Sequence, residues 1–218
     1  AENAIKVADF EVKQVRVTLD KEPKLGIVIP SKNRNTLLFA CIDSILENTR
    51  YRNYKIYMAD TGSDASVIEE FKQRYDKNPK VEMIKFNHYH FAGINNMVIK
   101  HMMDADTELV LCCNNDIQML NDAISMMVDV YLKNLNTVGT VGARLHYENG
   151  TLQHLGMAIT GNPSNPLAHN YGGEIFQRSD YSVDLGLVYA NTAAFMLISR
   201  NLYIYIGGNN ESKEKRFK

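Results

Sequence analysis

Glu108-Leu-Val-Leu-Cys-Cys-Asn-Asn-Asp116 is the stretch that decides the fold. Its five consecutive apolar residues, 109–113, predict a short strand covered on both faces, as in a parallel sheet. Polar residues follow at the carboxyl end of that strand, where open α/β sheets bind their ligands. Because side chains alternate along a strand, Asn114 and Asp116 are expected on the same side of the sheet. The stretch therefore predicts a ligand site that offers an amide and a carboxylate.

Further apolar runs surround this stretch and alternate with amphipathic segments. The runs predict strands over residues 25–30, 54–59, 81–86, 138–145 and 187–198. The amphipathic segments predict helices over residues 36–48, 66–75, 94–103, 121–132 and 200–206. Strands that alternate with helices of this length predict βαβ units, so the fold class is α/β, with a mostly parallel central sheet flanked by helices. Residues 161–173 are rich in Gly, Pro and Asn and predict a long loop.

Composition narrows the functional classes. The chain has 218 residues with 45% hydrophobic content and a net charge of -1, so it can bury a full core and has no electrostatic footprint for nucleic acid. Its three cysteines, Cys41, Cys112 and Cys113, lack metal-type spacing and predict reduced, buried thiols. No apolar run approaches the roughly 20 residues of a membrane span. We therefore expect a soluble cytoplasmic domain, able to work at the inner face of a membrane.

Five short motifs, in this order, resemble those of the family 2 glycosyltransferases with a GT-A fold, above all their O-antigen or rhamnosyltransferase-like branch. They are Ile27-Val-Ile-Pro30, Ala59-Asp-Thr-Gly-Ser-Asp64, Asn114-Asn-Asp116, Gly150-Thr-Leu-Gln-His154 and Ile206-Gly-Gly208. The resemblance covers residues 24–211. It implies a single GT-A domain that moves a hexosyl or deoxyhexosyl group from a UDP- or dTDP-type sugar nucleotide to a glycan or lipid-linked acceptor, with inversion, in bacterial cell-envelope polysaccharide synthesis.

The resemblance also implies a division of the chain. Residues 1–24 show a weak alternation of apolar and polar side chains, and they are expected to form a lead-in segment or an edge strand. The GT-A domain is expected over residues 25–218, with a nucleotide-binding half at 25–120 and an acceptor half at 121–218. We expect this second half to be cut short at its carboxyl end.

Several polar residues match family positions that bind the donor nucleotide. Asp60 matches the residue that contacts the base, and a carboxylate can accept the imide N–H of uracil or thymine. The simpler alternative is that Asp60 caps the helix that follows it. The residues implied for the nucleotide pocket are Pro30, Lys32, Asn33, Asp60, Asn96, Asn114 and Asn115, with Asn95 as the alternative to Asn96 and Asn114 placed near the ribose.

Asp116 matches the last acid of the family's Asp-x-Asp motif, which holds a divalent metal against the diphosphate. Mn²⁺ and Mg²⁺ suit this role, because they take oxygen ligands and one or two carboxylates plus substrate phosphates. Asn114 stands where the motif has its first acid. We therefore expect the metal to bind together with the diphosphate. The alternative is that Asp116 only closes a turn or caps the next helix.

The acceptor side is less clearly marked. Inverting transfer needs a general base, which the family places after its Gly-Gly motif. Here Glu211 or Glu214 is a candidate, or the base lies beyond Lys218, which is the option we favour. The resemblance places His154 and His169 near the donor sugar or acceptor, although a lone histidine is more often a structural hydrogen-bonding residue.

Two other functional classes are compatible with parts of the sequence. A nucleotidyltransferase has a similar α/β layer, but the loop Pro30-Ser-Lys-Asn-Arg34 lacks the glycines of a phosphate-binding loop. A non-catalytic nucleotide-sugar or carbohydrate-binding module fits the replacement of the first acid by Asn114. Release of nucleoside diphosphate from a donor distinguishes an enzyme from such a module.

Overall fold

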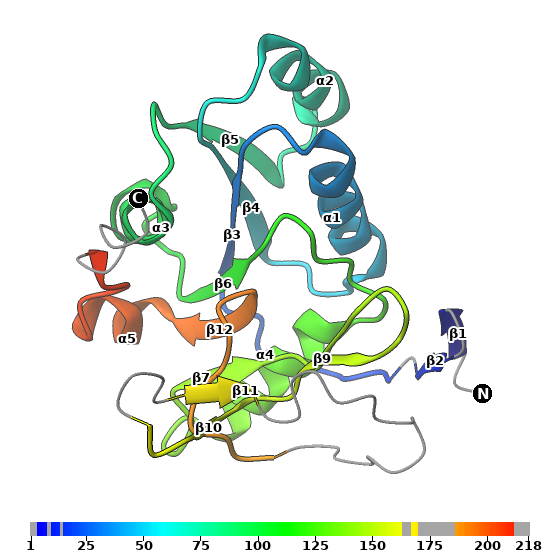
Figure 1. The fold of residues 1–218 in the computed structure, drawn as a ribbon, viewed down its shortest axis with the longest axis vertical. Helices are drawn as coiled ribbons and strands as arrows, with labels where there is room; N and C mark the ends of the chain where they lie inside the picture. The colour runs from blue at the N-terminus through cyan, green and yellow to red at the C-terminus, as the bar shows by residue number, and fades with distance from the viewer. Residues whose placement is uncertain (1–3, 8–9, 14, 163–166, 170–185, 212–218) are drawn as a thin grey trace.

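The structure, a computed structural model, describes residues 4–7, 10–13, 15–162, 167–169 and 186–211. Its centre is a six-stranded sheet with the order β5-β4-β3-β6-β12-β7 (Figure 1). The four neighbouring strands β5, β4, β3 and β6 are parallel to one another. Strand β12 runs antiparallel to both of its neighbours, β6 and β7. The mostly parallel sheet predicted from the sequence is confirmed. The strands are β3 (Leu25–Ser31), β4 (Tyr54–Asp60), β5 (Val81–Lys85), β6 (Leu109–Cys113), β7 (Thr140–Gly142) and β12 (Phe195–Ser199).

Helices cover both faces of this sheet (Figure 1). One face packs against α1 (Asn35–Asn48), α2 (Ala65–Tyr75) and α4 (Ala123–Lys133). The other face packs against α3 (Phe91–Met97), the π-helical turn η1 (Val98–Met102) and α5 (Arg200–Tyr205).

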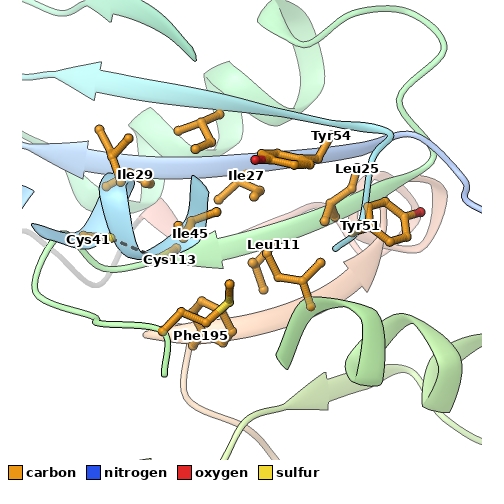
Figure 2. Packing of buried hydrophobic residues seen from close by; sticks show 14 of the residues in the cluster. Leu25, Ile27, Ile29, Cys41, Ile45, Tyr51, Tyr54, Leu111, Cys113 and Phe195 are labelled. Atoms are coloured by element: carbon orange, nitrogen blue, oxygen red, sulfur yellow. Dashed lines mark hydrogen bonds between the residues drawn. The ribbon is translucent and has the colours of Figure 1, made fainter. Parts of the chain in front are cut away.

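Side chains of the central strands divide between these two layers by strict alternation. Ile27 and Ile29 of β3 join the cluster under α1, whereas Val28 joins the cluster under α3. On β6, Leu111 faces α1 and Cys112 faces α3. Figure 2 shows the larger cluster, in which Ile27, Leu111 and Phe195 gather from three neighbouring strands. Burial on both faces explains why residues 109–113 are all apolar.

Pro30 lies near the end of the central strand β3, a place where proline is normally excluded because it cannot donate to a strand ladder. The pairing of β3 with β6 covers only Leu25 to Val28, so it has already ended before Pro30. On the other side Pro30 is in register with Ala59 of β4. The proline therefore lies beyond the last residue of β3 that pairs with β6, at the carboxyl edge of the sheet.

Three predicted elements differ from the structure. The helix predicted over residues 94–103 begins earlier, at Phe91, because the His90 side chain accepts a hydrogen bond from the Gly93 amide and caps it. The strand predicted over 138–145 is two short strands, β7 and β8 (Leu145–His146). The strand predicted over 187–198 is shorter, because Tyr189 and Ala190 bond instead to Met157.

Small hairpins lie outside the main sheet. They are β1 (Ala4–Val7) with β2 (Phe10–Lys13), β8 with β9 (Leu152–His154), and β10 (Met157–Ile159) with β11 (Leu167–His169). Strands β1 and β2 pair with each other and not with the central sheet. The predicted loop over 161–173 therefore contains one strand, and its residues 163–166 and 170–173 lie outside the described part. No helix in the described residues is long and apolar enough to cross a membrane.

Arg200 joins the end of the sheet to the helical layer. Its backbone N–H donates to the carbonyl of Glu108, before β6. Its guanidinium donates to the carbonyls of Ile99 at 2.8 Å, Lys100 at 3.4 Å and Asp104 at 2.9 Å. These carbonyls lie in and just after the last turn of η1, where helical hydrogen bonding has ended. One side chain thereby fixes the junction of β12 and α5 against η1.

We expect Arg200→Ala to lower the free energy of unfolding by about 1–3 kcal/mol, because partly buried carbonyl groups lose a charged donor. Urea denaturation followed by circular dichroism measures this loss. Arg52→Ala is the matched control, because Arg52 is exposed and bonds through its backbone N–H to Glu22. The control is expected to change stability by less than about 0.5 kcal/mol. Equal losses in the two variants would contradict the role of Arg200.

Candidate active site

The carboxyl ends of β3, β4 and β6 lie side by side, and the buried Ser31 joins the loops that follow them. The Ser31 carbonyl accepts hydrogen bonds from the Thr61 backbone N–H at 2.9 Å and the Thr61 hydroxyl at 3.1 Å. The Ser31 hydroxyl accepts from the Asn115 amide at 2.9 Å. The sequence analysis did not single out Ser31. Its position as the last residue of a strand, just before a polar loop, is the only feature of the sequence that could have indicated this role.

Asn33 locks the first two loops together. Its backbone N–H donates to the Ser63 hydroxyl at 2.8 Å, and its side-chain oxygen accepts from the Asp64 N–H at 2.8 Å. Asn33 has a φ of 54°, a left-handed conformation that asparagine adopts more readily than most residues. Its side chain therefore shapes the loop, whereas the neighbouring Lys32 is exposed at the same edge.

Asp60 is 2% exposed and organises the turn that follows β4. Its carboxylate accepts hydrogen bonds from the backbone N–H groups of Ser63 at 3.1 Å and Gly62 at 3.4 Å. Gly62 has a φ of 100°, which favours glycine in this turn. The alternative that Asp60 caps α2 is wrong, because the residue at the N-cap position is Asp64.

Asp116 is exposed in a turn just beyond β6. The strand ends at Cys113, so the alternation used to place Asn114 and Asp116 on one side does not extend to them. The alternative role of Asp116 as a helix cap is also wrong, because Asp122 occupies the N-cap of α4. The Asn114 backbone is held in place, since its N–H donates to the carbonyl of Ala194 at 2.8 Å. Asp116 is thus presented to solvent from a fixed edge.

The donor set at this edge fits a hard divalent cation that is shared with a ligand. Among the described residues, no group of three or more His, Cys, Asp and Glu side chains forms a metal site. Asp116 supplies one exposed carboxylate, and the half-buried Asn114 lies two residues before it. Mg²⁺ and Mn²⁺ commonly bind through one or two carboxylates and complete their shell with substrate phosphates and water.

The cysteines at the end of β6 are not candidate nucleophiles or metal ligands. Burial raises the pKa of the Cys112 thiol to about 12, and burial likewise raises the pKa of Cys113. The Cys41 and Cys113 sulfurs lie 3.8 Å apart in the core (Figure 2). Because the thiolate is the reactive form, the raised pKa values keep Cys112 and Cys113 as unreactive thiols at neutral pH.

Asn96 lies in α3 and is almost fully buried. Its amide nitrogen donates to the Asn209 carbonyl at 2.9 Å and to the Glu211 carboxylate at 2.8 Å. Its amide oxygen accepts from the Tyr203 hydroxyl at 2.7 Å and the Asn209 N–H at 2.8 Å. These four hydrogen bonds of Asn96 all run to α5 and the segment after it. Glu214 lies outside the described residues.

The two predicted histidines lie in the hairpin region. His154 is 1% exposed, and its Nε2 accepts hydrogen bonds from the backbone N–H groups of Gly156 at 3.2 Å and Thr192 at 3.4 Å. This geometry favours the structural alternative for His154. His169 ends β11 opposite Met157, and its side chain lies outside the described part of the structure.

A doubly covered, mostly parallel sheet with polar loops gathered at the ends of β3, β4 and β6 is the architecture in which open α/β proteins bind ligands at the carboxyl edge. Residues 26–207 match Glycosyl transferase family 2, so the chain belongs to that family. The predicted family and fold class are confirmed.

Known proteins with similar sequences or folds support this assignment. The uncharacterized protein y4gI of Sinorhizobium fredii is 30% identical over 89% of this chain and 21% of its own length. The O-antigen biosynthesis protein RfbC of Myxococcus xanthus is 26% identical over 91% of this chain and 15% of its own length. The chain therefore spans about a fifth or less of the length of these two relatives. The mannosyltransferase PcManGT of Pyrobaculum calidifontis, solved with GDP-Man and Mn²⁺, has a similar fold, with a TM-score of 0.51 and 17% identity over 59% of this chain and 37% of its own.

His154→Leu is expected to lower the free energy of unfolding by about 1–3 kcal/mol, because two backbone N–H groups lose their acceptor in a buried place. His154→Gln is the matched variant, since a side-chain oxygen can accept in place of Nε2, and its loss should be smaller. Thermal unfolding compares the two variants. Nucleotide affinity, measured by calorimetry, should be unchanged in both. A leucine variant of normal stability that no longer binds nucleotide would show that His154 acts at the ligand site.

Proposed function

We propose that this chain is a glycosyltransferase domain that moves a sugar from a nucleoside diphosphate donor to a glycan or lipid-linked acceptor, with inversion at the anomeric carbon. The observation that carries the proposal is the linkage of three polar loops through Ser31 at the carboxyl edge of the sheet, in a chain of family 2. The relative RfbC is named for O-antigen biosynthesis, which supports a polysaccharide acceptor. The GDP-Man in the mannosyltransferase structure supports a sugar nucleotide as donor.

The donor nucleotide is proposed to lie across the loops after β3, β4 and β6. Asp60 accepts a hydrogen bond from the base, which we expect to be the uracil or thymine of a UDP- or dTDP-sugar. Asn114 and Asn115 bond to the ribose, and the exposed Lys32 lies on the same edge with a charge suited to the diphosphate. Asn33 contributes by holding the β3 and β4 loops in register.

Asp116 is the proposed protein ligand of a Mn²⁺ or Mg²⁺ ion that enters with the diphosphate, as Mn²⁺ accompanies GDP-Man in the mannosyltransferase. When bound, such an ion acts as a Lewis acid that stabilises negative charge on the leaving diphosphate. A single carboxylate holds a divalent ion weakly without the phosphate ligands. Metal and nucleotide are therefore expected to bind with positive coupling.

Glu211 is the proposed general base among the described residues, because its carboxylate is exposed yet held at one oxygen by Asn96. The acceptor hydroxyl oxygen forms a bond to the anomeric carbon, its proton passes to the Glu211 carboxylate, and the bond from that carbon to the diphosphate oxygen breaks. The acceptor is proposed to bind along residues 121–218, which include His169. A lipid-linked acceptor would bring the reaction to the cytoplasmic face of the inner membrane.

Calorimetric titration with UDP, dTDP and GDP, each with and without Mn²⁺, tests the donor site. We expect one nucleotide to bind more tightly with Mn²⁺. In Asp116→Ala the gain given by Mn²⁺ should disappear, because the protein ligand of the shared ion is lost. Asp60→Ala should weaken binding with or without metal, because a base partner is removed and the turn at residues 61–63 loses its acceptor.

Asp76→Ala is the matched control for both variants. Asp76 is an exposed carboxylate at the carboxyl end of α2, at the opposite end of that helix from the site. It should bind nucleotide as the unchanged protein does. Absence of binding by all three nucleotides would refute the proposed function. Saturable binding of a sugar nucleotide without release of nucleoside diphosphate would instead indicate a binding module.

A further inference from the structure

We propose that Asn96 is a positioning residue for Glu211, a role that rests on the proposed function. Family position predicts Asn96 in the nucleotide pocket, whereas the hydrogen bonds of its side chain run to α5 and the segment after it. Its side chain orients the carboxylate that takes the proton. Asn96 itself touches neither the donor nor the acceptor.

The contacts of Asn96 use its whole hydrogen-bonding capacity on one short segment. Two acceptors, the Asn209 carbonyl and the Glu211 carboxylate, receive its two amide hydrogens. Two donors, the Tyr203 hydroxyl and the Asn209 N–H, bond to its oxygen. An amide that donates and accepts at the same time is needed here, because neither a carboxylate nor a hydroxyl has this set of groups.

The segment that Asn96 holds is built to come close to it. Gly207 and Gly208 follow α5 with φ values of 89° and 80°, so the chain turns back after the helix. A side chain at residue 208 would collide with the Asn96 oxygen and the Tyr203 ring, so the approach requires glycine. Lys100, in η1, donates to the Gly207 carbonyl and adds a second tie to the same layer.

The position of α3 relates this contact to the donor edge. The Phe86 N–H, just after β5, donates to the Asp60 carbonyl, so α3 begins only a few residues beyond the edge where the nucleotide is proposed to bind. Asn96 lies in the second turn of α3. Glu211 is therefore fixed to a helix that starts at the donor edge, although 115 residues separate it from Asn96 in the chain.

A purely structural role for Asn96 is the competing explanation, and the neighbouring Asn95 provides the comparison. Asn95 is also an asparagine of α3 and is 1% exposed. Its amide nitrogen donates to the Phe91 carbonyl within the helix, away from the segment after α5. Asn95→Ala thus removes a buried amide from the same helix without touching the support of Glu211.

The test is a double-mutant cycle on the rate of nucleoside diphosphate release with water as the acceptor. UDP-glucose, dTDP-rhamnose and GDP-mannose are the donors tried. Water then supplies the attacking oxygen, and its proton goes to Glu211. Glu211→Gln should lower the rate by about 10²–10⁴-fold, because the base is removed. Asn96→Asp should lower it by about 10²-fold, because a second carboxylate displaces Glu211 from its working position.

The double variant, Asn96→Asp with Glu211→Gln, decides between positioning and structure. If Asn96 acts through Glu211, the double variant is as slow as Glu211→Gln alone, since no base remains to be positioned. Calorimetry should show unchanged nucleotide affinity in Asn96→Asp, so that the loss is in kcat. Losses that multiply in the double variant, or an Asn96→Asp rate equal to that of the unchanged protein, would overturn the proposal.

Hydrogen exchange of a peptide spanning Tyr203 to Glu211 supplies a readout that needs no activity. In Asn96→Ala the Asn209 amide loses its acceptor and should exchange faster, whereas Asn95→Ala and Asn96→Asp should retain its protection. Retained protection shows that Asn96→Asp folds with the segment in place. Unchanged exchange in Asn96→Ala would overturn the proposed contact. If the unchanged protein binds none of the nucleotides, the proposed function fails, and the role of Asn96 fails with it.

Discussion

Burial of β3 and β6 on both faces is the constraint from which the rest of the structure follows. With α1 on one side and α3 on the other, a polar side chain along these strands has no solvent to reach. Polar residues are therefore confined to the strand ends. Because β3, β4 and β6 are parallel neighbours, their carboxyl ends bring such residues to one edge. The site is a geometric consequence of the core.

The loops at that edge need a fixed conformation, and many of their polar side chains form the hydrogen bonds that provide it. Asp60 accepts from its own turn, Asn33 bridges two loops, and Ser31 joins a third. The bonds to Asp60 and Asn33 satisfy backbone N–H groups of the second loop, and the bond to Ser31 joins two side chains. Preorganised loops of this kind do not have to be ordered when a ligand binds. Lys32 and Asp116 are exposed at the same edge and are the charged groups proposed to contact the ligand.

The sequence predicted the elements that depend on apolar periodicity and missed those that depend on a particular hydrogen bond. The apolar run at residues 109–113 correctly predicted β6, because a strand buried on both faces is a continuous run of apolar residues. The start of α3 was missed because His90 is an unusual cap, and its role depends on one contact with Gly93. The contact between Asn96 and Glu211 could not be predicted, because a contact between residues 115 positions apart leaves no local pattern.

Side chains of α3 and residues around η1 hold the end of the described chain in place. Arg200 bonds to carbonyls in and just after η1, and the segment after α5 bonds to Asn96. Residues separated by about a hundred positions thus share one helical layer, whose first residue follows the loop at the donor edge. Asn96 contacts the Glu211 carboxylate directly, and Lys100 and Arg200 add further bonds between the same helical layer and the end of the chain. Under the proposed function, the helix that follows the donor edge also carries the side chain that orients the Glu211 carboxylate, so one element serves both donor binding and proton transfer.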